Sequence, residues 1–455
     1  MSGLWTSSEL AVATGGVASA PFDVSGVAFD SREVGPGDLF VALKGEQTDG
    51  HRFVDQAFAQ GAGGAIVSQP VDGPHVLVAD TAQALDALGA ASRARTGAVV
   101  IGVTGSVGKT SVKEALFAAL DRAVPGKAHR SLKSCNNHVG VPLSLARMPR
   151  DTRFGIFEMG MNHAGELAAL TRLVRPNIAL VTAVALAHGA FFADEAAIAA
   201  AKGEIFEGLE PGGTAVIPYD SPHRDRLIAA AEPHAGQIVT FGRDPQADVS
   251  AREGIALGKG TLVSARLRTC ELTFTIALPG EHWVSNALAL LAVVEAAGGD
   301  IAAAGLALAD MAGLAGRGRR LTIRLPDGDA LLIDEAYNAN PASMRATLKV
   351  LGAEKASRRL AILGGMRELG PSEQAEHEAL AAPVAEAGVD FALLVGKEMT
   401  PLAQALEGQV PFAHVPDAAA ALAEARARIA PGDAVLVKGS NGIGLQRLVE
   451  ALAEA

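Results

Sequence analysis

Short runs of β-branched and other apolar residues alternate along most of the chain with longer runs rich in Ala, Leu and Glu. The first kind of run predicts a strand and the second predicts a helix. The apolar runs are continuous, which is typical of parallel sheets covered by helices on both faces. The strands predicted in this way are 98–103, 154–157, 178–184, 214–217, 331–333, 360–363, 391–395 and 434–437. The sequence therefore predicts an α/β fold.

Two polar stretches divide the chain. Residues 92–97 precede the first strong strand, and residues 316–320, Gly-Arg-Gly-Arg-Arg, precede the final block of strands and helices. A Gly/Arg run is most often a solvated linker. Before the first stretch the pattern differs, with shorter strands and many Gly and Asp turns. We therefore expect three domains, at 1–94, 95–315 and 316–455.

Composition narrows the class of protein. The 455 residues are 49% hydrophobic but only 4% aromatic, so the cores are expected to consist of Ala, Val, Leu and Ile. The net charge of −11 excludes a uniformly basic surface for nucleic acid. Two cysteines, Cys135 and Cys270, make no disulfide framework, and no signal peptide or membrane-length apolar run is visible. We expect a cytoplasmic monomer with no nucleic-acid partner and no membrane span.

The strongest local signal is segment 100–111, Val-Ile-Gly-Val-Thr-Gly-Ser-Val-Gly-Lys-Thr-Ser, where a strand enters a glycine loop and then a helix expected over 112–120. Glycines let backbone N–H groups surround phosphate oxygens, and the helix start adds its positive end. Lys109 would neutralise β- and γ-phosphates, and Thr110 would ligate Mg²⁺. Val103 stands where the strict pattern has Gly, and an ordinary strand–turn–helix corner is the alternative. The expected nucleotide-binding residues are Gly105, Ser106, Val107, Gly108, Lys109, Thr110 and Ser111.

Three further residues each have a functional and a structural interpretation when they are considered singly. Glu158 ends a predicted strand on the edge that carries the glycine loop, where it can reach Mg²⁺ or simply be solvated. His188 follows another apolar run, and such a histidine is more often structural. Lys202 lies in a helical run, and its spacing alone favours a solvated helix residue.

Six segments in order carry a resemblance to a known family. They are 104–110 (TGSVGKT), 136–142 (NNHVGVP), 158–162 (EMGMN), 201–206 (AKGEIF), 334–341 (DEAYNANP) and 438–440 (KGS). Together they resemble the Mur ligases, the ATP-dependent amide-bond-forming enzymes of peptidoglycan precursor synthesis. The resemblance spans essentially the whole chain. It implies a smaller N-terminal α/β domain for the UDP end of the substrate, a central P-loop ATPase domain with a parallel sheet, and a C-terminal Rossmann-like ligase domain that closes over the nucleotide about a hinge at 316–320.

The resemblance also implies residue roles. Lys109, Glu158, His188 and Lys202 would be catalytic, and Thr110, Glu158 and His188 would hold the magnesium ion. Lys202 matches a lysine that is carbamylated in related ligases, which would reverse its interpretation as a solvated residue. The further nucleotide contacts implied are Asn286, Arg317, Arg319 and Asp334. The substrate contacts implied are Ser31, Lys44, Gly45, Asn136, Asn137, Tyr337, Asn338 and Asn340. From the residues alone, Asn286 can be a helix cap, and Ser31 and Lys44 can be surface turn residues.

Within the family, the chain is most similar to members that use ATP and Mg²⁺ to join D-alanyl-D-alanine to the terminal carboxylate of UDP-N-acetylmuramoyl-tripeptide through an acyl phosphate. One alternative is the ligase that adds the third-position diamino acid, but Ala342 and Ser343 follow Asn340-Pro341 where that member has Arg. A non-catalytic P-loop nucleotide switch is the other alternative, disfavoured by Glu158 and His188. Gly365 departs from the Asp usual in the family. The sequence leaves open whether substrate residue three is lysine or diaminopimelate, and whether Lys202 is modified.

Overall fold

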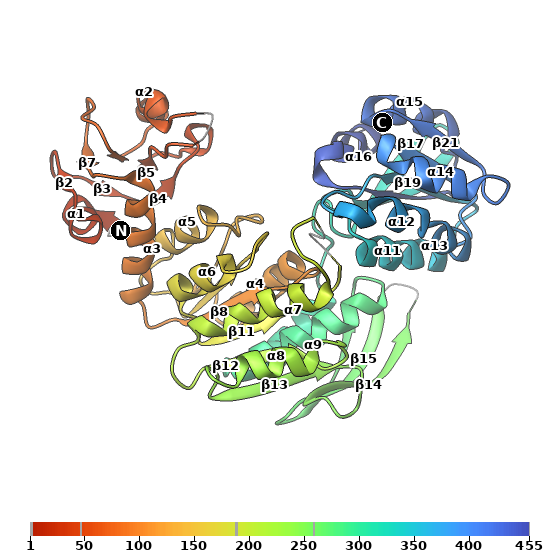
Figure 1. Cartoon of the computed structure of the whole chain (residues 1–455), viewed down its shortest axis with the longest axis horizontal. Coiled ribbons are helices and arrows are strands. Elements are labelled where there is room, and N and C mark those ends of the chain that lie inside the picture. Colours follow the sequence, from red (N-terminus) through yellow and green to blue (C-terminus); the bar gives the residue numbers. More distant parts are fainter. Residues whose placement is uncertain (1–2, 46–47, 187–189, 258–259, 455) are drawn as a thin grey trace.

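Three α/β units follow one another along the chain in the computed structural model, which describes residues 3–45, 48–186, 190–257 and 260–454. The N-terminal and C-terminal units lie on either side of the middle unit (Figure 1). Each unit has its own main sheet, of five, nine and six strands in chain order. Within the described ranges, no helix is both long and apolar enough to cross a membrane.

The N-terminal unit has short strands, as its sequence pattern indicates. Its elements are β1 (Trp5–Thr6), α1 (Ser7–Thr14), β2 (Val17–Ala18), β3 (Asp23–Val24), β4 (Gly26–Ala28), β5 (Asp38–Val41), α2 (Val54–Ala59), β6 (Gly64–Val67), β7 (His75–Leu77) and α3 (Thr81–Ala94). The main sheet has the order β2-β7-β6-β5-β4 and is parallel except for β2. The Trp5 indole N–H donates to the Ala146 carbonyl of the middle unit at 2.9 Å, so the two units share a packed junction.

The middle unit contains the largest sheet. Its elements are β8 (Val99–Thr104), α4 (Lys109–Ala123), β9 (Ala128–Arg130), α5 (Gly140–Ala146), β10 (Phe154–Glu158), α6 (Glu166–Val174), β11 (Ile178–Val181), α7 (Glu195–Gly203), β12 (Thr214–Pro218), α8 (Arg224–Ala231), β13 (Gln237–Gly242), β14 (Val249–Ala256), β15 (Thr261–Arg266), β16 (Glu271–Ile276), α9 (Glu281–Ala296) and α10 (Ile301–Ala309). The strand order is β16-β15-β14-β13-β12-β11-β8-β10-β9. The sheet is parallel from β9 to β14.

One edge of the middle sheet departs from the parallel arrangement that the sequence pattern predicts. Strands β14, β15 and β16 pair antiparallel, because short connections join them and no crossover helix intervenes. The strand predicted over 178–184 is also too long, since β11 ends at Val181. The other seven predicted strands all overlap observed ones.

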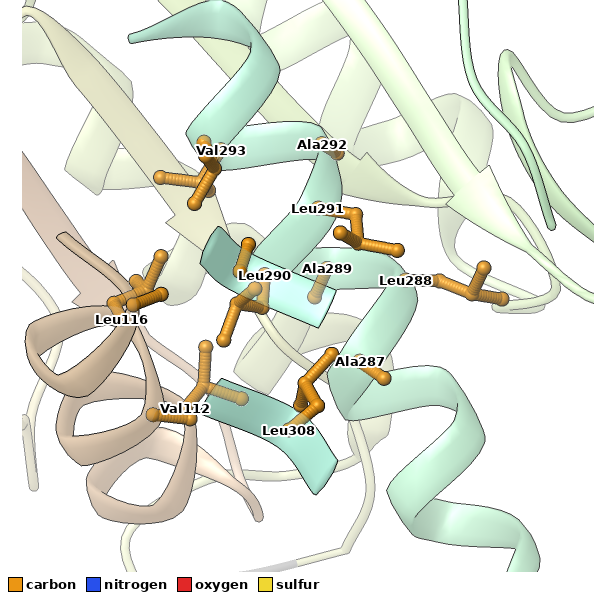
Figure 2. Packing of buried hydrophobic residues seen from close by; sticks show 14 of the residues in the cluster. Val112, Leu116, Ala287, Leu288, Ala289, Leu290, Leu291, Ala292, Val293 and Leu308 are labelled. Carbon is orange, nitrogen blue, oxygen red and sulfur yellow. The ribbon is translucent and has the colours of Figure 1, made fainter. Parts of the chain in front are cut away.

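Helices cover both faces of the middle sheet. Successive residues of β8 point to opposite faces, so Ile101 and Val103 join one buried cluster while Val100 joins the other. Figure 2 shows the first cluster, where Val112 and Leu116 of α4 meet Leu290 of α9 and neighbouring apolar side chains. This packing fixes the start of α4, and therefore the glycine loop, against the sheet.

The C-terminal unit contains a second mostly parallel sheet. Its elements are β17 (Arg319–Leu325), β18 (Gly328–Glu335), α11 (Pro341–Ala353), β19 (Arg359–Gly364), α12 (Glu373–Glu378), α13 (Ala381–Glu386), β20 (Phe391–Val395), α14 (Thr400–Leu406), β21 (Phe412–Val415), α15 (Ala418–Arg428), β22 (Ala434–Lys438) and α16 (Leu445–Ala453). The order is β17-β18-β22-β19-β20-β21, with only the β17–β18 pair antiparallel.

The Gly/Arg segment 316–320 is not the solvated linker that such a run most often forms. Its last two residues belong to β17. The Gly316 N–H donates to Asp334 Oδ2 at 2.8 Å, and the Gly318 N–H donates to the Asp334 carbonyl at 3.0 Å. Both glycines have positive φ, 71° and 80°, which a residue with a side chain rarely adopts. Asp334 therefore holds this segment onto the C-terminal unit.

Candidate functional site

A cavity of about 590 Å³ lies between the middle and C-terminal units. It is bordered by the carboxyl ends of β8 and β10 on one side and of β18 and β22 on the other. Ligand crevices of open parallel sheets form at such ends. The residues expected from the sequence that line it are Ser106, Val107, Gly108, Lys109, Thr110, Ser111, Asn136, Glu158, Lys202, Asn286, Arg317, Tyr337, Asn338 and Asn340.

The glycine loop has the geometry of an anion cradle. Gly105 and Gly108 have φ of 152° and 85°. A Cβ on Gly105 would come within 2.0 Å of Thr182 Oγ1, and one on Gly108 within 2.8 Å of Asn286 Oδ1, so both positions require glycine. Helix α4 begins at Lys109 with no side-chain cap, which leaves its first N–H groups available to a phosphate. Lys109 Nζ donates to the Gly105 carbonyl at 2.5 Å. Burial lowers the pKa of Lys109.

The segment after β11 binds to the glycine loop and does not extend the strand. The Thr182 hydroxyl donates to the Val107 carbonyl at 2.6 Å, and the Ser106 hydroxyl donates to the Ala185 carbonyl at 2.8 Å. Backbone bonds also join the two segments, from the Thr182 N–H to the Thr104 carbonyl at 2.9 Å and from the Ser106 N–H to the Ala183 carbonyl at 2.8 Å. Sequence reasoning missed Thr182 because nothing in its spacing distinguishes it from a strand residue. The predicted ligand His188 lies outside the described residues.

Glu158 accepts hydrogen bonds from two other candidate residues. Thr110 Oγ1 donates to Oε2 at 2.8 Å, and Asn136 Nδ2 donates to Oε1 at 2.8 Å. Glu158 is only 1% exposed, so a merely solvated carboxylate is excluded. A carboxylate beside a hydroxyl at the phosphate loop is a set of hard oxygen donors that suits Mg²⁺, which keeps several waters and binds substrate phosphates. No cluster of three or more His, Cys, Asp or Glu of metal-binding geometry occurs among the described residues.

Lys202 is buried in the cavity wall, where the spacing of the sequence alone favoured a solvated residue. It is 2% exposed, at the end of α7. Burial, followed by the nearby charge of Lys109, holds the pKa of Lys202 well below its usual range. Within the described part of the chain its ammonium group has no hydrogen-bond or ion-pair partner. Burial therefore disfavours the charged form of this amine, which faces the phosphate loop.

The C-terminal unit contributes a cationic and aromatic wall. The Arg317 guanidinium stacks on the Tyr337 ring at 4.3 Å, and the Tyr337 hydroxyl contacts the Ser134 hydroxyl of the middle unit. Lys438 Nζ lies 3.7 Å from Glu335 Oε2 and donates to the Asn338 carbonyl at 3.0 Å. Burial raises the pKa of Glu335 and lowers that of Lys438. Sequence reasoning assigned no role to Glu335, although it immediately follows Asp334.

Asp334 and Arg319 do not line the cavity. Asp334 is 2% exposed and its Oδ2 accepts from Arg319 Nη2 at 3.1 Å as well as from Gly316. The Asp334 carboxylate, expected to contact the nucleotide, is thus occupied by donors of its own chain, because the Gly/Arg segment folds back over it. In this structure Glu335, not Asp334, faces the cavity.

The asparagines divide between ligand-facing and structural positions. Asn286 is the sixth residue of α9 and faces Gly108, so the alternative that it caps the helix is wrong. Asn340 lines the cavity but also caps α11, with its Oδ1 accepting from the Ser343 N–H at 2.9 Å. Asn137 is exposed, lies off the cavity, and its Oδ1 accepts from the Gly140 N–H at 2.9 Å. His282, beside Asn286, also lines the cavity, and burial lowers its pKa to about 4.

The three substrate residues expected in the N-terminal unit lie apart from the cavity. Ser31 is 7% exposed, and its hydroxyl donates to Gln56 Oε1 at 3.2 Å. Lys44 and Gly45 are exposed on the turn after β5, where the Gly45 N–H donates to the Thr48 carbonyl at 2.9 Å. The surface-turn interpretation thus fits Lys44 but not Ser31. All three follow the carboxyl ends of β4 and β5.

A second cavity of about 560 Å³ lies further along the carboxyl edge of the C-terminal sheet. Arg367, which follows β19, lines it together with Lys397 and His414. Gly365, where the resemblance leads us to expect Asp, lies nearby. A Cβ at Gly365 would meet Glu398 Cβ at 2.9 Å, so Glu398 occupies the space of the missing side chain.

A glycine loop opening a helix, faced across a cavity by a second α/β unit with its own cations, defines a multidomain nucleotide-binding protein. The Mur ligase middle domain matches residues 103–294, the Mur ligase glutamate ligase domain matches 319–441, and the catalytic domain of the Mur ligase family matches 23–107. This chain belongs to the Mur ligase family.

Known proteins align with this chain over nearly its full length. The UDP-N-acetylmuramoyl-tripeptide–D-alanyl-D-alanine ligase of Escherichia coli (strain K12) is 36% identical over 449 residues, 97% of either chain. MurF from Acinetobacter baumannii superposes with a TM-score of 0.86 at 32% identity and covers 99% of both chains. MurF ligase from Thermotoga maritima in complex with ADP has a TM-score of 0.78 at 25% identity and covers 94% of this chain and 97% of its own. The predicted family and α/β fold class are confirmed.

Proposed function

We propose that this protein is an ATP-dependent ligase that joins D-alanyl-D-alanine to the terminal carboxylate of UDP-N-acetylmuramoyl-tripeptide in peptidoglycan precursor synthesis. The observation that carries the proposal is the convergence of Lys109, Thr110, Glu158 and Lys202 on one cavity that a second unit borders with Arg317 and Lys438. Relatives that are named for this activity align with nearly the whole chain, and one similar structure was solved in complex with ADP.

A carboxylate and an amine do not condense in neutral water, because the carboxylate oxygen is a poor leaving group. The tripeptide carboxylate attacks the γ-phosphate of ATP in line, which breaks the bond to ADP and forms an acyl phosphate. The loop N–H groups and the Lys109 ammonium offset the charge on the transferring phosphoryl oxygens. The free amine of D-alanyl-D-alanine then attacks the acyl carbon, and phosphate leaves. The C-terminal unit, in contact through Tyr337 and Ser134, limits the access of water to the acyl phosphate.

Thr110 and Glu158 would hold Mg²⁺ in this proposal, and the predicted ligand His188 lies outside the described residues. When bound, the ion adds positive charge beside the β- and γ-phosphates. Lys202 would act as a carbamate, formed when its neutral amine attacks CO₂ and loses a proton. The buried, unpaired amine supports this assignment, since carbamate formation requires the uncharged form.

The second cavity would receive the far end of the dipeptide. It lies on the same sheet edge as the nucleotide cavity, in the strand order β18-β22-β19-β20-β21. Arg367 offers a cation to the dipeptide carboxylate. Ala342 and Ser343, which line the nucleotide cavity, bring no cation that would bind a free amino acid as in the diamino-acid-adding alternative.

The decisive experiment measures phosphate release from ATP with UDP-N-acetylmuramoyl-tripeptide, with and without D-alanyl-D-alanine. A ligase releases phosphate and forms the UDP-pentapeptide only when the dipeptide is present, whereas a nucleotide switch hydrolyses ATP without it. Lys109→Ala should abolish ligation and leave binding of the UDP substrate nearly intact. Dipeptide-independent hydrolysis, or near-normal turnover by Lys109→Ala, would overturn the proposal.

A further inference from the structure

Lys113 is a fully buried cation that does not line the cavity. It lies on α4, one helical turn after Lys109, and is 0% exposed. Its ammonium donates to the Ser131 carbonyl at 2.8 Å and to the Lys133 carbonyl. It also pairs with Glu114 Oε1 at 2.9 Å and lies 3.9 Å from Glu158 Oε2. A buried ammonium is tolerated only when its protons are used in this way. The phosphate-loop mechanism assigns it no role.

The two carbonyls that Lys113 binds belong to one loop, residues 131–137, which we call the 131–137 loop. Lys133 adopts a positive φ of 51°, an unfavourable conformation for a residue with a side chain, and its carbonyl accepts from the Lys113 ammonium. The same loop carries Ser134, which contacts Tyr337, and Asn136, which donates to Glu158. Its backbone at Ser131 and Asn136 also bonds β10 and the turn after it.

Further contacts hold Lys113 and its partner Glu114 in place. Glu114 Oε2 lies 2.7 Å from Arg130 Nε, and the Arg130 guanidinium stacks on Phe117 at 3.7 Å. The Glu158 N–H donates to Ser131 Oγ at 3.0 Å, so the loop start and the end of β10 are bonded directly. Lys113 therefore joins the helix that begins at the phosphate loop to the loop that presents Asn136 and Ser134 to the cavity.

We propose that Lys113 is a positioning residue that holds the 131–137 loop in the shape needed to bind the peptide end of the acyl substrate. The proposal rests on the proposed function for the identity of that substrate. Without the ammonium, the Lys133 carbonyl loses the partner that stabilises its left-handed conformation, and the loop relaxes. Asn136 then moves relative to Glu158, and a displacement of about 1 Å at such a site can cost up to about a hundredfold in rate.

The test compares Lys113→Gln and Lys113→Arg with the unmodified protein in ligation kinetics. Lys113→Gln should raise KM for UDP-N-acetylmuramoyl-tripeptide at least tenfold while KM for ATP changes less than threefold. Lys113→Arg, which keeps the charge and several donors, should recover most of the loss. Lys113→Arg also provides a second variant for the test if Lys113→Gln does not fold. Hydrogen exchange of residues 131–137 and of the Glu158 and Gly160 amides should accelerate in Lys113→Gln.

Two comparisons separate positioning from general damage. Asn136→Ala combined with Lys113→Gln should raise KM for the UDP substrate no further than the larger single effect, because both act through one loop. Lys127→Gln, an exposed lysine paired with Asp151, should change neither KM nor exchange. Three results would overturn the proposal. They are an unchanged KM and unchanged hydrogen exchange in Lys113→Gln, equal rises in KM for ATP and for the UDP substrate, or effects that multiply in the double variant. If the unmodified protein does not ligate, the proposed function fails, while the exchange experiment still decides the role of Lys113.

Discussion

Replacing Lys202 by Met should lower ligation activity without lowering the stability of the protein. Most substitutions of buried residues instead destabilise the fold. Lys202 is 2% exposed and has no polar partner within the described part of the chain. Methionine has a similar length and flexibility, so it fills the same space without an amine. Measured without nucleotide or Mg²⁺, Lys202→Met should therefore be at least as stable as the unmodified protein.

The magnitude follows from the cost of burying an unpaired polar group. Protein substitutions place that cost at about 1–3 kcal/mol, and partial contact of the amine with the cavity reduces it. We expect a gain of about 1 kcal/mol in the free energy of unfolding, equivalent to a rise in Tm of about 2–4 °C for a unit of this size. Ligation should instead fall by about 10²–10³-fold in kcat, the usual effect of removing one group that stabilises transferring charge.

Urea unfolding checks the expected gain in stability, and ligation kinetics on the same preparations check the expected loss of activity. Lys127→Met provides a matched control, because the Lys127 ammonium is exposed and pairs with Asp151. It should stay within about 0.5 kcal/mol of the unmodified protein and keep full activity. A Lys202→Met protein that loses more than 1 kcal/mol of stability, or ligates within threefold of the unmodified rate, would refute the reasoning about this amine.

Two other predictions follow from the structure. Burial lowers the pKa of His129 to about 4 from 6.5, so between pH 6.5 and about 4 the unfolded chain takes up a proton that the folded chain does not. The free energy of unfolding should fall there by up to about 1.4 kcal/mol per pH unit from this group. Urea unfolding at pH 7, 5.5 and 4.5 should show a shallower fall for His129→Gln, and parallel pH profiles would contradict this. Arg367→Gln should raise KM for D-alanyl-D-alanine about tenfold or more, equivalent to about 1.5–3 kcal/mol for a charged hydrogen bond, without changing KM for ATP. An unchanged dipeptide KM, with Arg122→Gln as the exposed control, would place the dipeptide elsewhere.

Local signals in the sequence predicted most of the elements that build the site. Continuous apolar runs located β8 and β10, and the glycine loop followed by Lys109 and Thr110 lies at the cavity between the units. These signals are reliable because they depend on neighbouring residues, such as the positive φ of Gly108 and the free N–H groups at the start of α4. The antiparallel edge β14–β16 was missed, because its strands mix polar and apolar residues and contain no continuous apolar run.

The sequence by itself determined the α/β class, the glycine loop and the set of polar residues available to the site. Only the tertiary structure decided which of them meet. Glu335 faces the cavity while Asp334 is bound to the folded-back Gly/Arg segment, and Lys202 is a buried amine where its spacing favoured a solvated one. Lys113 was not singled out at all. The physical reason is the same for each: burial and pairing depend on side chains brought together from distant elements, and those contacts leave no periodic or spacing pattern in the chain.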